Sequence, residues 1–223
     1  MTIFMIESAP MRWILFSKPF AATEEIMAEI TPVLTRHIVE GNPPLDFTGY
    51  RATGGYEPMR LAVETLPPSK VREIVKESNL RGRGGAGFPT GVKWGFVPQG
   101  KDSPRPKYII ANGDEMEPGT FKDRLLIHGN PHQLVESMII TGWALQADIG
   151  YIFLRPEYEM GAHLLEAAIE EAYAAGFLGD NILGSHWSFE LHTHTSAGRY
   201  ICCLLYTSPS PRDATLWGSA GSA

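Results

Sequence analysis

The sequence lacks the features of a secreted, a nucleic-acid-binding or a membrane-spanning protein. Its only two cysteines, Cys202 and Cys203, are adjacent, so they can form neither a disulfide framework nor a C-x-x-C chelate. Basic residues are outnumbered, and the net charge of −6 argues against binding to nucleic acid or anionic membranes. The apolar segment MRWILF is too short to span a bilayer and has no cleavage site behind it. We expect a soluble or peripheral protein of a reducing compartment, with no direct membrane insertion.

The remaining composition is that of an ordinary globular domain, with 43% hydrophobic and 20% charged residues among 223. The Gly- and Pro-rich segment EGNPPLDFTGYRATGGYEP is interpreted as a loop, and PPSKVREIVKESNL as a helix. Strand and helix patterns then alternate through KYIIAN (a short buried strand), DRLLIHGNPHQLVESMIITGWALQA, GYIFLR, EYEMGAHLLEAAIEEAYAAG and SFELHTHT. This alternation predicts an α/β fold with a mostly parallel sheet, in which ligand sites lie at the carboxyl ends of the strands.

The glycine-dense segment LRGRGGAGFPTGVKW, residues 80–94, is the most informative stretch of the chain. Glycines let a backbone lie close against a flat ring or a pyrophosphate, and Arg81, Arg83 and Lys93 add positive charge that a phosphate favours. A Rossmann fingerprint follows a strand, whereas this segment follows a predicted helix. The lysine of a P-loop is followed by serine or threonine, whereas Lys93 is followed by Trp94. It is therefore a candidate nucleotide-binding loop that is neither a Rossmann fingerprint nor a P-loop. The alternative is a flexible surface turn. Its glycines are Gly82, Gly84, Gly85, Gly87 and Gly91.

A second polar segment, NGDEMEPGTFKDR, comes directly after the strand KYIIA. Asn112, Asp114, Glu115 and Glu117 place an amide and three carboxylates at the carboxyl end of that strand, where they could face the hydroxyls or ring nitrogens of a ligand. The alternative is that the carboxylates favour the positive end of the helix that follows.

Other candidates are weaker. His192 and His194 share one face of a predicted strand, but no third metal ligand accompanies them in sequence, which favours a solvated face. No serine elbow, zinc-binding helix or cysteine cluster occurs. The residues alone therefore indicate a nucleotide cofactor, with its redox character left open.

At these segments the chain resembles a known family, the NADH-binding flavoprotein subunit of bacterial NADH-quinone oxidoreductase (complex I) and its diaphorase relatives. The matching text runs from about Gly41 to Cys202 and comprises LRGRGGAGFPTGVKW, NGDEMEPGTFKDRLL, PHQLVESMII, GYIFLRPEY, AAGFLGDNILG and FELHTHTSAGRYIC. The resemblance implies a Rossmann-like layered FMN- and NADH-binding domain, incomplete, over residues 41–202. An N-terminal extension of uncertain origin (residues 1–40) would precede it, and a disordered tail (residues 203–223) would follow it.

The resemblance also implies roles for individual residues. The glycine loop would lie between FMN and NADH, with Lys93 near the flavin and with Phe88 and Phe96 facing the nicotinamide nucleotide. Asn112, Asp114 and Glu115 would contact the ribityl chain of the flavin and the neighbourhood of its phosphate. Glu117 would lie on the nicotinamide side. The implied cofactor-binding set is Gly82, Arg83, Gly84, Gly85, Gly87, Phe88, Gly91, Lys93, Phe96, Asn112, Asp114, Glu115, Glu117 and Tyr200, with no catalytic acid or base and no metal ligand.

The implied activity is hydride transfer from the nicotinamide C4 of NADH to flavin N5, followed by one-electron steps to iron–sulfur clusters and quinone in the full complex. The implied partners are NADH, the thioredoxin-like 2Fe-2S subunit and the large iron–sulfur subunit. The implied location is cytoplasmic, peripheral on the inner face of the bacterial membrane. One alternative is a diaphorase subunit of a soluble NAD-dependent formate dehydrogenase or hydrogenase, and another is an inactive, truncated nucleotide-binding fragment.

The chain departs from the family pattern after Cys202. Family members continue with Gly-Glu-Glu-Thr-Ala-Leu, whereas Cys203 stands here in place of the glycine, and the four cysteines that hold the family's [4Fe-4S] cluster are absent. The tail CLLYTSPSPRD is similar to a sequencing-library adapter translated in frame. We therefore hypothesise that residues 203–223 are not native and that the natural gene continues beyond Cys202.

Overall fold

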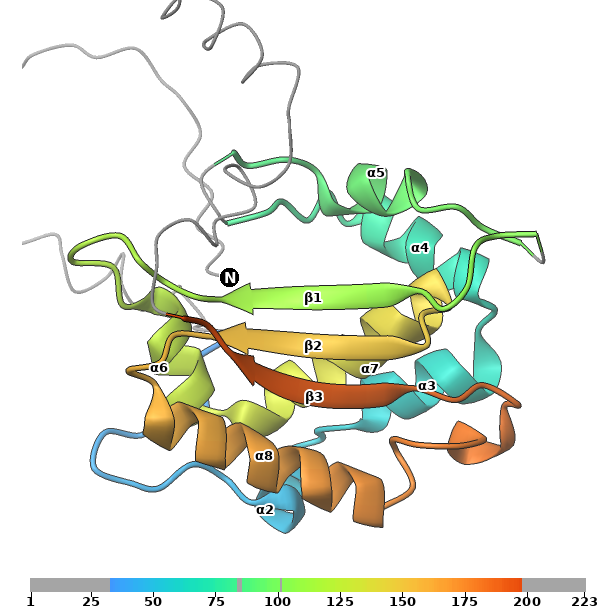
Figure 1. Ribbon diagram of the computed structural model, residues 1–223. Helices are drawn as coiled ribbons and strands as arrows, with labels where there is room; N and C mark the ends of the chain where they lie inside the picture. The colour runs from blue at the N-terminus through green and yellow to red at the C-terminus, as the bar shows by residue number, and fades with distance from the viewer. Residues whose placement is uncertain (1–32, 84–85, 101, 198–223) are drawn as a thin grey trace, which may run out of the picture.

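The computed structural model describes residues 33–83, 86–100 and 102–197 (Figure 1). Three residues of the predicted cofactor-binding set, Gly84, Gly85 and Tyr200, lie outside these ranges. So do the tail 203–223 and most of the extension 1–40.

Three parallel strands form the sheet, in the order β1 (Tyr108–Gly113), β2 (Ile149–Leu154) and β3 (Glu190–Thr195). The strands are paired in register from their first residues to their last, so their carboxyl ends form one edge. This arrangement confirms the predicted α/β fold with a parallel sheet, and it brings the residues that follow each strand to a common edge.

Helices connect the strands and cover one face of the sheet. α6 (Lys122–Gly129) and α7 (Pro131–Leu145) lead from β1 to β2, and α8 (Glu159–Ala174) and the short η1 (Ile182–Gly184) lead from β2 to β3. Both connections step across the sheet in the same direction, and right-handed crossovers then place their helices on the same face. The helices pack there on the core side chains of the strands, such as Ile152, Leu154 and Leu191.

The other face of the sheet is open among the described residues. Tyr108 is 56% exposed and Ile110 is 59% exposed, so the prediction of a buried first strand was wrong. Apolar residues occupy both faces of β1, and a short apolar run cannot reveal that only one of those faces is covered. The outward rings stack on one another across the strands, as with Tyr108 on Tyr151 and Phe153 on His194.

One helix, α2 (Phe47–Ala52), lies within the segment 40–58 that the sequence indicated as a loop, and a second, α3 (Glu57–Thr65), begins at the end of that segment. α2 begins where the Asp46 carboxylate accepts a hydrogen bond from the Gly49 amide at 2.7 Å. Pro58 lies in the first turn of α3, where proline is favourable, and Gly54 has a positive φ between the two helices, whereas Gly49 lies inside α2. The predicted helix α4 (Pro68–Glu77) is confirmed, and α5 (Thr90–Gly95) follows the glycine loop.

Buried and partly buried hydrogen bonds tie α2 and α3 to α7 and α8. Glu136 of α7 accepts from the Tyr50 hydroxyl at 2.6 Å and from the Met59 amide at 3.2 Å. On α8, Glu171 accepts from the Phe47 amide at 3.0 Å, and its carboxylate also lies 3.0 Å from Nε2 of the buried His132. These two carboxylates satisfy amides in the first turns of α2 and α3, so they fix the N-terminal helices to the rest of the domain.

Candidate functional site

The glycine loop is closed at its neck by backbone hydrogen bonds. The Gly82 amide donates to the Phe88 carbonyl at 2.9 Å, and the Thr90 amide donates to the Leu80 carbonyl at 2.7 Å. Gly87 has φ of +60°, a conformation that residues with a side chain rarely adopt. Figure 1 shows both arms of this loop running from α4 and α5 toward the side of the molecule on which the arrowheads of the strands lie.

Side chains on this loop leave donor groups and aromatic faces for a ligand. The Arg83 Nε is shielded from solvent and has no hydrogen-bond partner among the described residues. Phe88 is 45% exposed and Phe96 is 73% exposed, with ring centroids 6.2 Å apart, and Lys93 lies exposed on α5. A buried donor without a partner is unfavourable unless a ligand satisfies it, so the loop suits an anionic or hydrogen-bonding group.

Gly91 has a packing role that explains the absence of a side chain. A Cβ at this position would lie 2.4 Å from the Cα of Lys76, so only glycine lets the start of α5 approach the end of α4 this closely. Gly91 therefore positions the helix that follows the loop, and direct contact between Gly91 and a cofactor remains a prediction.

Asn112 and Asp114 lie at the carboxyl end of β1. The exposed Asn112 turns the chain there, because its side-chain oxygen accepts from the Asp114 amide at 3.0 Å. Both Asp114 carboxylate oxygens are shielded from solvent, and neither forms a hydrogen bond of ordinary geometry among the described residues. Burial raises the pKa of Asp114, while the nearby Ser196 hydroxyl and the Arg155 guanidinium lower it. Asp114 is thus a partly buried acceptor at the edge that binds ligands in such sheets.

Glu115 points back into the protein. Its buried carboxylate accepts long hydrogen bonds of 3.2 to 3.4 Å from the backbone amides of Lys122, Asp123 and Arg124, which form the first turn of α6. The Tyr158 hydroxyl also donates to it, at 3.4 Å. Glu115 therefore interacts with the positive end of the next helix, which was the alternative that the sequence left open for these carboxylates. Its carboxylate orders the loop between β1 and α6.

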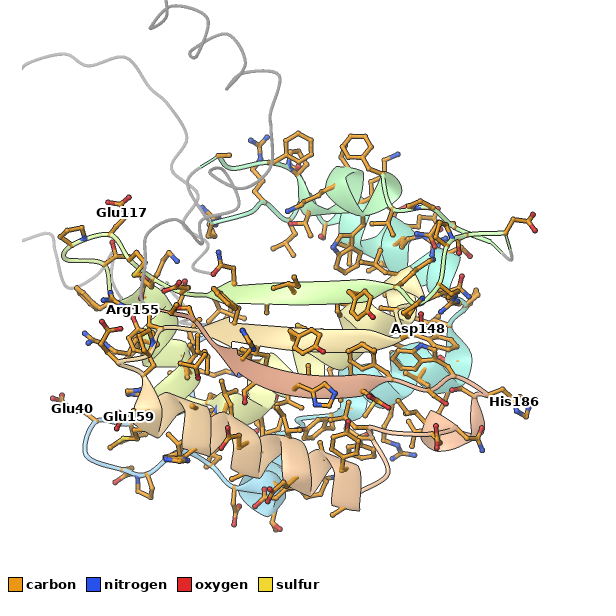
Figure 2. All side chains as sticks on the ribbon, viewed as in Figure 1. Glu40, Glu117, Asp148, Arg155, Glu159 and His186 are labelled. Atoms are coloured by element: carbon orange, nitrogen blue, oxygen red, sulfur yellow. The ribbon has the colours of Figure 1, made fainter. Side chains whose placement is uncertain are left out.

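Arg155, directly after β2, holds the same loop from the other side. Its Nη1 donates to the backbone carbonyl of Glu115 at 2.7 Å, and its other guanidinium nitrogens bond to the Glu157 carboxylate at 3.1 and 3.2 Å. The guanidinium carbon lies 5.9 Å from the centre of the Tyr158 ring. Figure 2 shows Arg155 and Glu117 at the same end of the sheet, with Glu117 pointing outward from the loop.

The structure thus gathers Asn112, Asp114 and Glu115 at one edge and directs the described arms of the glycine loop toward that side. Sequence reasoning missed Arg155, Tyr158 and Ser196, which follow the second and third strands at this edge. Arg155 ends the segment GYIFLR, Tyr158 follows it by three residues, and Ser196 directly follows SFELHTHT. This position at the strand ends was the signal that could have identified them, because the ends of parallel strands converge.

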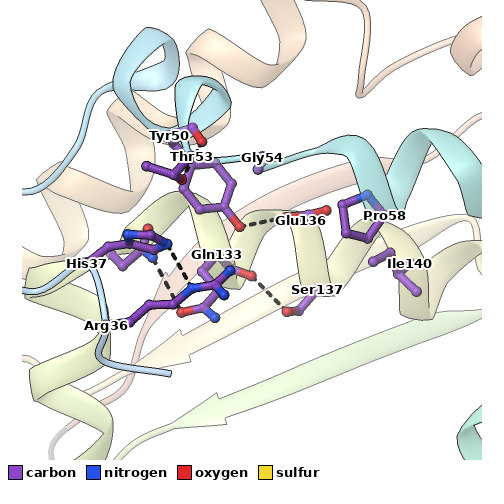
Figure 3. A pocket seen from close by; sticks show the side chains of 12 residues that line it. Arg36, His37, Tyr50, Thr53, Gly54, Pro58, Gln133, Glu136, Ser137 and Ile140 are labelled. Carbon is purple, nitrogen blue, oxygen red and sulfur yellow. Dashed lines mark hydrogen bonds between the residues drawn. The ribbon is translucent and has the colours of Figure 1, made fainter. Parts of the chain in front are cut away.

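The cavities in the described part of the chain include one at the edge of the sheet and one beside α7. One of about 310 Å³ lies at the carboxyl ends of β2 and β3, where it is lined by Arg155, Tyr158, Thr195 and the start of α8. The other, of about 230 Å³, lies among Arg36, α2 and α7 and contains the Tyr50–Glu136 hydrogen bond (Figure 3). Of these two, the first adjoins the edge that carries the predicted site.

Metal and membrane features are limited in the part of the chain that the structure describes. That part holds no cluster of three or more His, Cys, Asp or Glu side chains that could bind a metal ion. His192 and His194 lie exposed on β3, against the rings of Tyr151 and Phe153. Among the described helices, none is both long and apolar enough to cross a bilayer.

A parallel α/β domain with a glycine loop and a polar carboxyl edge belongs to the nucleotide-binding class of folds. Comparison with known proteins narrows this class to one family. The chain belongs to the Complex1_51K family, the Nuo51 FMN-binding domain, whose model matches residues 75–204.

The curated relatives are named as subunits of one enzyme, NADH-quinone oxidoreductase. Such a subunit of Rhizobium meliloti (strain 1021) is 48% identical over 171 residues, which are 77% of this chain and 40% of that protein. The corresponding subunit of Escherichia coli (strain K12) is 49% identical over 172 residues, covering 77% of this chain and 38% of that protein. The chain therefore spans about two fifths of the length of these relatives.

Solved structures of NAD⁺-reducing [NiFe]-hydrogenase are also similar. In the H₂-reduced state the match has a TM-score of 0.56 and 33% identity, and it covers 80% of this chain and 30% of that chain. In the air-oxidized state the TM-score is 0.55 at 32% identity, covering 69% and 25% of the two chains.

Proposed function

We propose that this chain is the FMN- and NADH-binding part of the flavoprotein subunit of an NADH-quinone oxidoreductase. The observation that carries the proposal is the polar carboxyl edge of the sheet, with Asp114 and the glycine loop, within a chain that belongs to an FMN-binding family. The proposed cofactors are FMN and NADH. Bound FMN would accept a hydride from NADH and release the electrons singly.

The residues of the chain would bind and orient the two nucleotides. The Asp114 carboxylate would accept hydrogen bonds from the hydroxyls of a ribityl chain, and the Asn112 amide would donate to them. Arg83 and Lys93 would offset phosphate charge, and the exposed rings of Phe88 and Phe96 would cover a nicotinamide face. Glu115 would act indirectly, because its carboxylate is already occupied by α6.

The wider setting is also part of the proposal. We propose that the parent protein passes electrons to iron–sulfur clusters and then to quinone, with the thioredoxin-like 2Fe-2S subunit and the large iron–sulfur subunit as partners. A [4Fe-4S] cluster would be held by cysteines that this sequence does not contain. The complex would lie on the cytoplasmic face of the membrane, where this chain is peripheral.

The diaphorase alternative has support of its own, from the similarity to NAD⁺-reducing hydrogenase at 32% and 33% identity. The complex I relatives are more similar, at 48% and 49% identity. The identities therefore favour the quinone-linked enzyme, although the same proposed nucleotide-binding edge would serve either system.

The test is to purify the full 223-residue chain, add FMN, and separate protein from free flavin. We expect FMN to stay with the protein and its visible absorbance to bleach when NADH is added without oxygen. Retention of FMN without bleaching would support the alternative of an inactive nucleotide-binding fragment. A chain that is folded by circular dichroism yet retains no FMN would contradict the proposal.

A further inference from the structure

Arg155 lies at the carboxyl edge of the sheet, although the sequence assigned it no role. It follows the last residue of β2, Leu154, whose register partner on β1 is Gly113. The loop that begins after Gly113 carries Asp114 and Glu117 before α6 starts at Lys122. Arg155 is therefore next to the loop that displays the candidate flavin ligands.

All three guanidinium nitrogens of Arg155 are used in fixed directions. Nη1 donates to the Glu115 carbonyl at 2.7 Å, while Nε and Nη2 bond to the two carboxylate oxygens of Glu157 at 3.1 and 3.2 Å. The forked bond with Glu157 holds the planar guanidinium in one orientation, and a lysine could not reproduce it. The remaining nitrogen is thereby aimed at the backbone of the loop.

We infer that Arg155 is a positioning residue, which fixes the backbone of the loop after β1 and thereby holds Asp114 in place for the flavin, beside the Asn112 side chain that accepts from the Asp114 amide. This inference rests on the proposed function, since it concerns the same site. Arg155 would act through the loop, and no contact between Arg155 and the cofactor is required.

The charge of Arg155 also acts on Asp114. Burial raises the pKa of this carboxyl group, the Ser196 hydroxyl and Arg155 lower it, and Glu157 raises it slightly. From α6, Lys122 faces the neighbouring Glu115, with its Nζ 3.5 Å from that carboxylate. Without Arg155 the pKa of Asp114 rises, so the acceptor that the flavin hydroxyls need becomes protonated at a higher pH.

The experiment compares Arg155→Gln and Arg155→Lys with the unaltered full chain, with FMN affinity measured by fluorescence titration across a pH series. We expect Arg155→Gln to weaken FMN binding by about tenfold, as for loss of a charged hydrogen bond. FMN affinity should fall as the pH is lowered, and we expect this fall to begin at a higher pH in Arg155→Gln than in the unaltered chain. Arg155→Lys should weaken FMN binding, because lysine cannot form the two-nitrogen bond with the Glu157 carboxylate. It should retain the original pH profile, because lysine keeps the positive charge. Arg60→Gln, which removes an exposed arginine on α3, is the matched control.

A second readout is independent of the flavin. Hydrogen exchange of the backbone amides in residues 114–121 should become faster in Arg155→Gln and stay unchanged in Arg60→Gln. If the unaltered chain binds no FMN, the proposed function fails and hydrogen exchange alone decides whether Arg155 fixes the loop. Wild-type exchange rates in Arg155→Gln would overturn the inference, as would wild-type FMN affinity and pH profile in a chain that does bind FMN.

Discussion

At the scale of single residues, the glycines of one loop serve different physical purposes. Gly87 has a positive φ in an open position, whereas Gly91 lies in a helix and is pressed against the backbone of Lys76. Both fit the same sequence pattern, because a pattern of glycines does not distinguish a turn from a close approach between helices. Only the neighbours across space separate the two roles.

Gly91 gives a direct test at this scale. We expect Gly91→Ala to lower the free energy of unfolding by about 1–3 kcal/mol, because the new Cβ would meet the backbone of α4 rather than a flexible side chain. Urea denaturation followed by circular dichroism measures the change. Gly95→Ala is the control, since nothing lies within 4 Å of a Cβ at that position. Equal stabilities of the two variants would be incompatible with the packing role of Gly91.

At the scale of secondary-structure elements, carboxylates attach one helix to another. Glu115 caps α6 from the preceding loop, and Glu171 of α8 meets both α2 and the buried His132 of α7. Sequence reasoning found α6, α7 and α8 from their apolar periodicity, but it missed α2 and α3. Those two short helices depend on caps and buried partners distant in sequence, which periodicity cannot reveal.

The Glu115 cap yields a prediction for α6. Glu115→Gln should lower the free energy of unfolding by about 1–2 kcal/mol, because a neutral amide is a weaker acceptor for the amides at the helix start. Glu159→Gln, which changes an exposed carboxylate in the first turn of α8, should have an effect within about 0.5 kcal/mol. Thermal and urea denaturation measure both variants. A result in which the two substitutions cost the same would argue against the cap.

His132 makes the stability of the domain depend on pH. Its Nε2 donates to the Glu171 carboxylate, so its Nδ1 accepts from the Tyr56 hydroxyl at 3.0 Å. Burial lowers the pKa of His132, and the attraction of Glu171 and Asp46 only partly offsets this effect. The unfolded chain therefore binds a proton more readily than the folded chain does. The stabilising contribution is complete above a pH of about 6.5 and declines as the pH falls below that value.

We accordingly expect the free energy of unfolding to fall by about 1 kcal/mol between about pH 7.5 and about pH 5.5. The measurement is urea denaturation at both pH values. His132→Gln should reduce this difference, while His163→Gln, which removes an exposed histidine of α8, should preserve it. A difference that persists unchanged in His132→Gln would mean that other groups cause it.

At the scale of the whole molecule, the order of strands and helices was predictable and the distribution of burial was not. Alternating patterns predicted a parallel sheet, and its carboxyl edge then follows from topology. The open outer face of the sheet and the inward direction of the Glu115 side chain depend on which elements pack together. The periodicity of apolar residues reveals neither. Asn112, Asp114 and the glycine loop could be selected from the sequence, whereas Arg155 and Ser196 required the register of the strands.

The central claim is that this carboxyl edge binds FMN, and the most direct measurement is the FMN dissociation constant of the full chain and of Asp114→Asn. This variant keeps the shape of the side chain and removes the charged acceptor, so we predict that FMN binds about tenfold more weakly. Ser137→Ala, in the cavity between α2 and α7, should bind FMN as the unaltered chain does. An unchanged dissociation constant in Asp114→Asn, or a loss of binding in Ser137→Ala, would contradict the account.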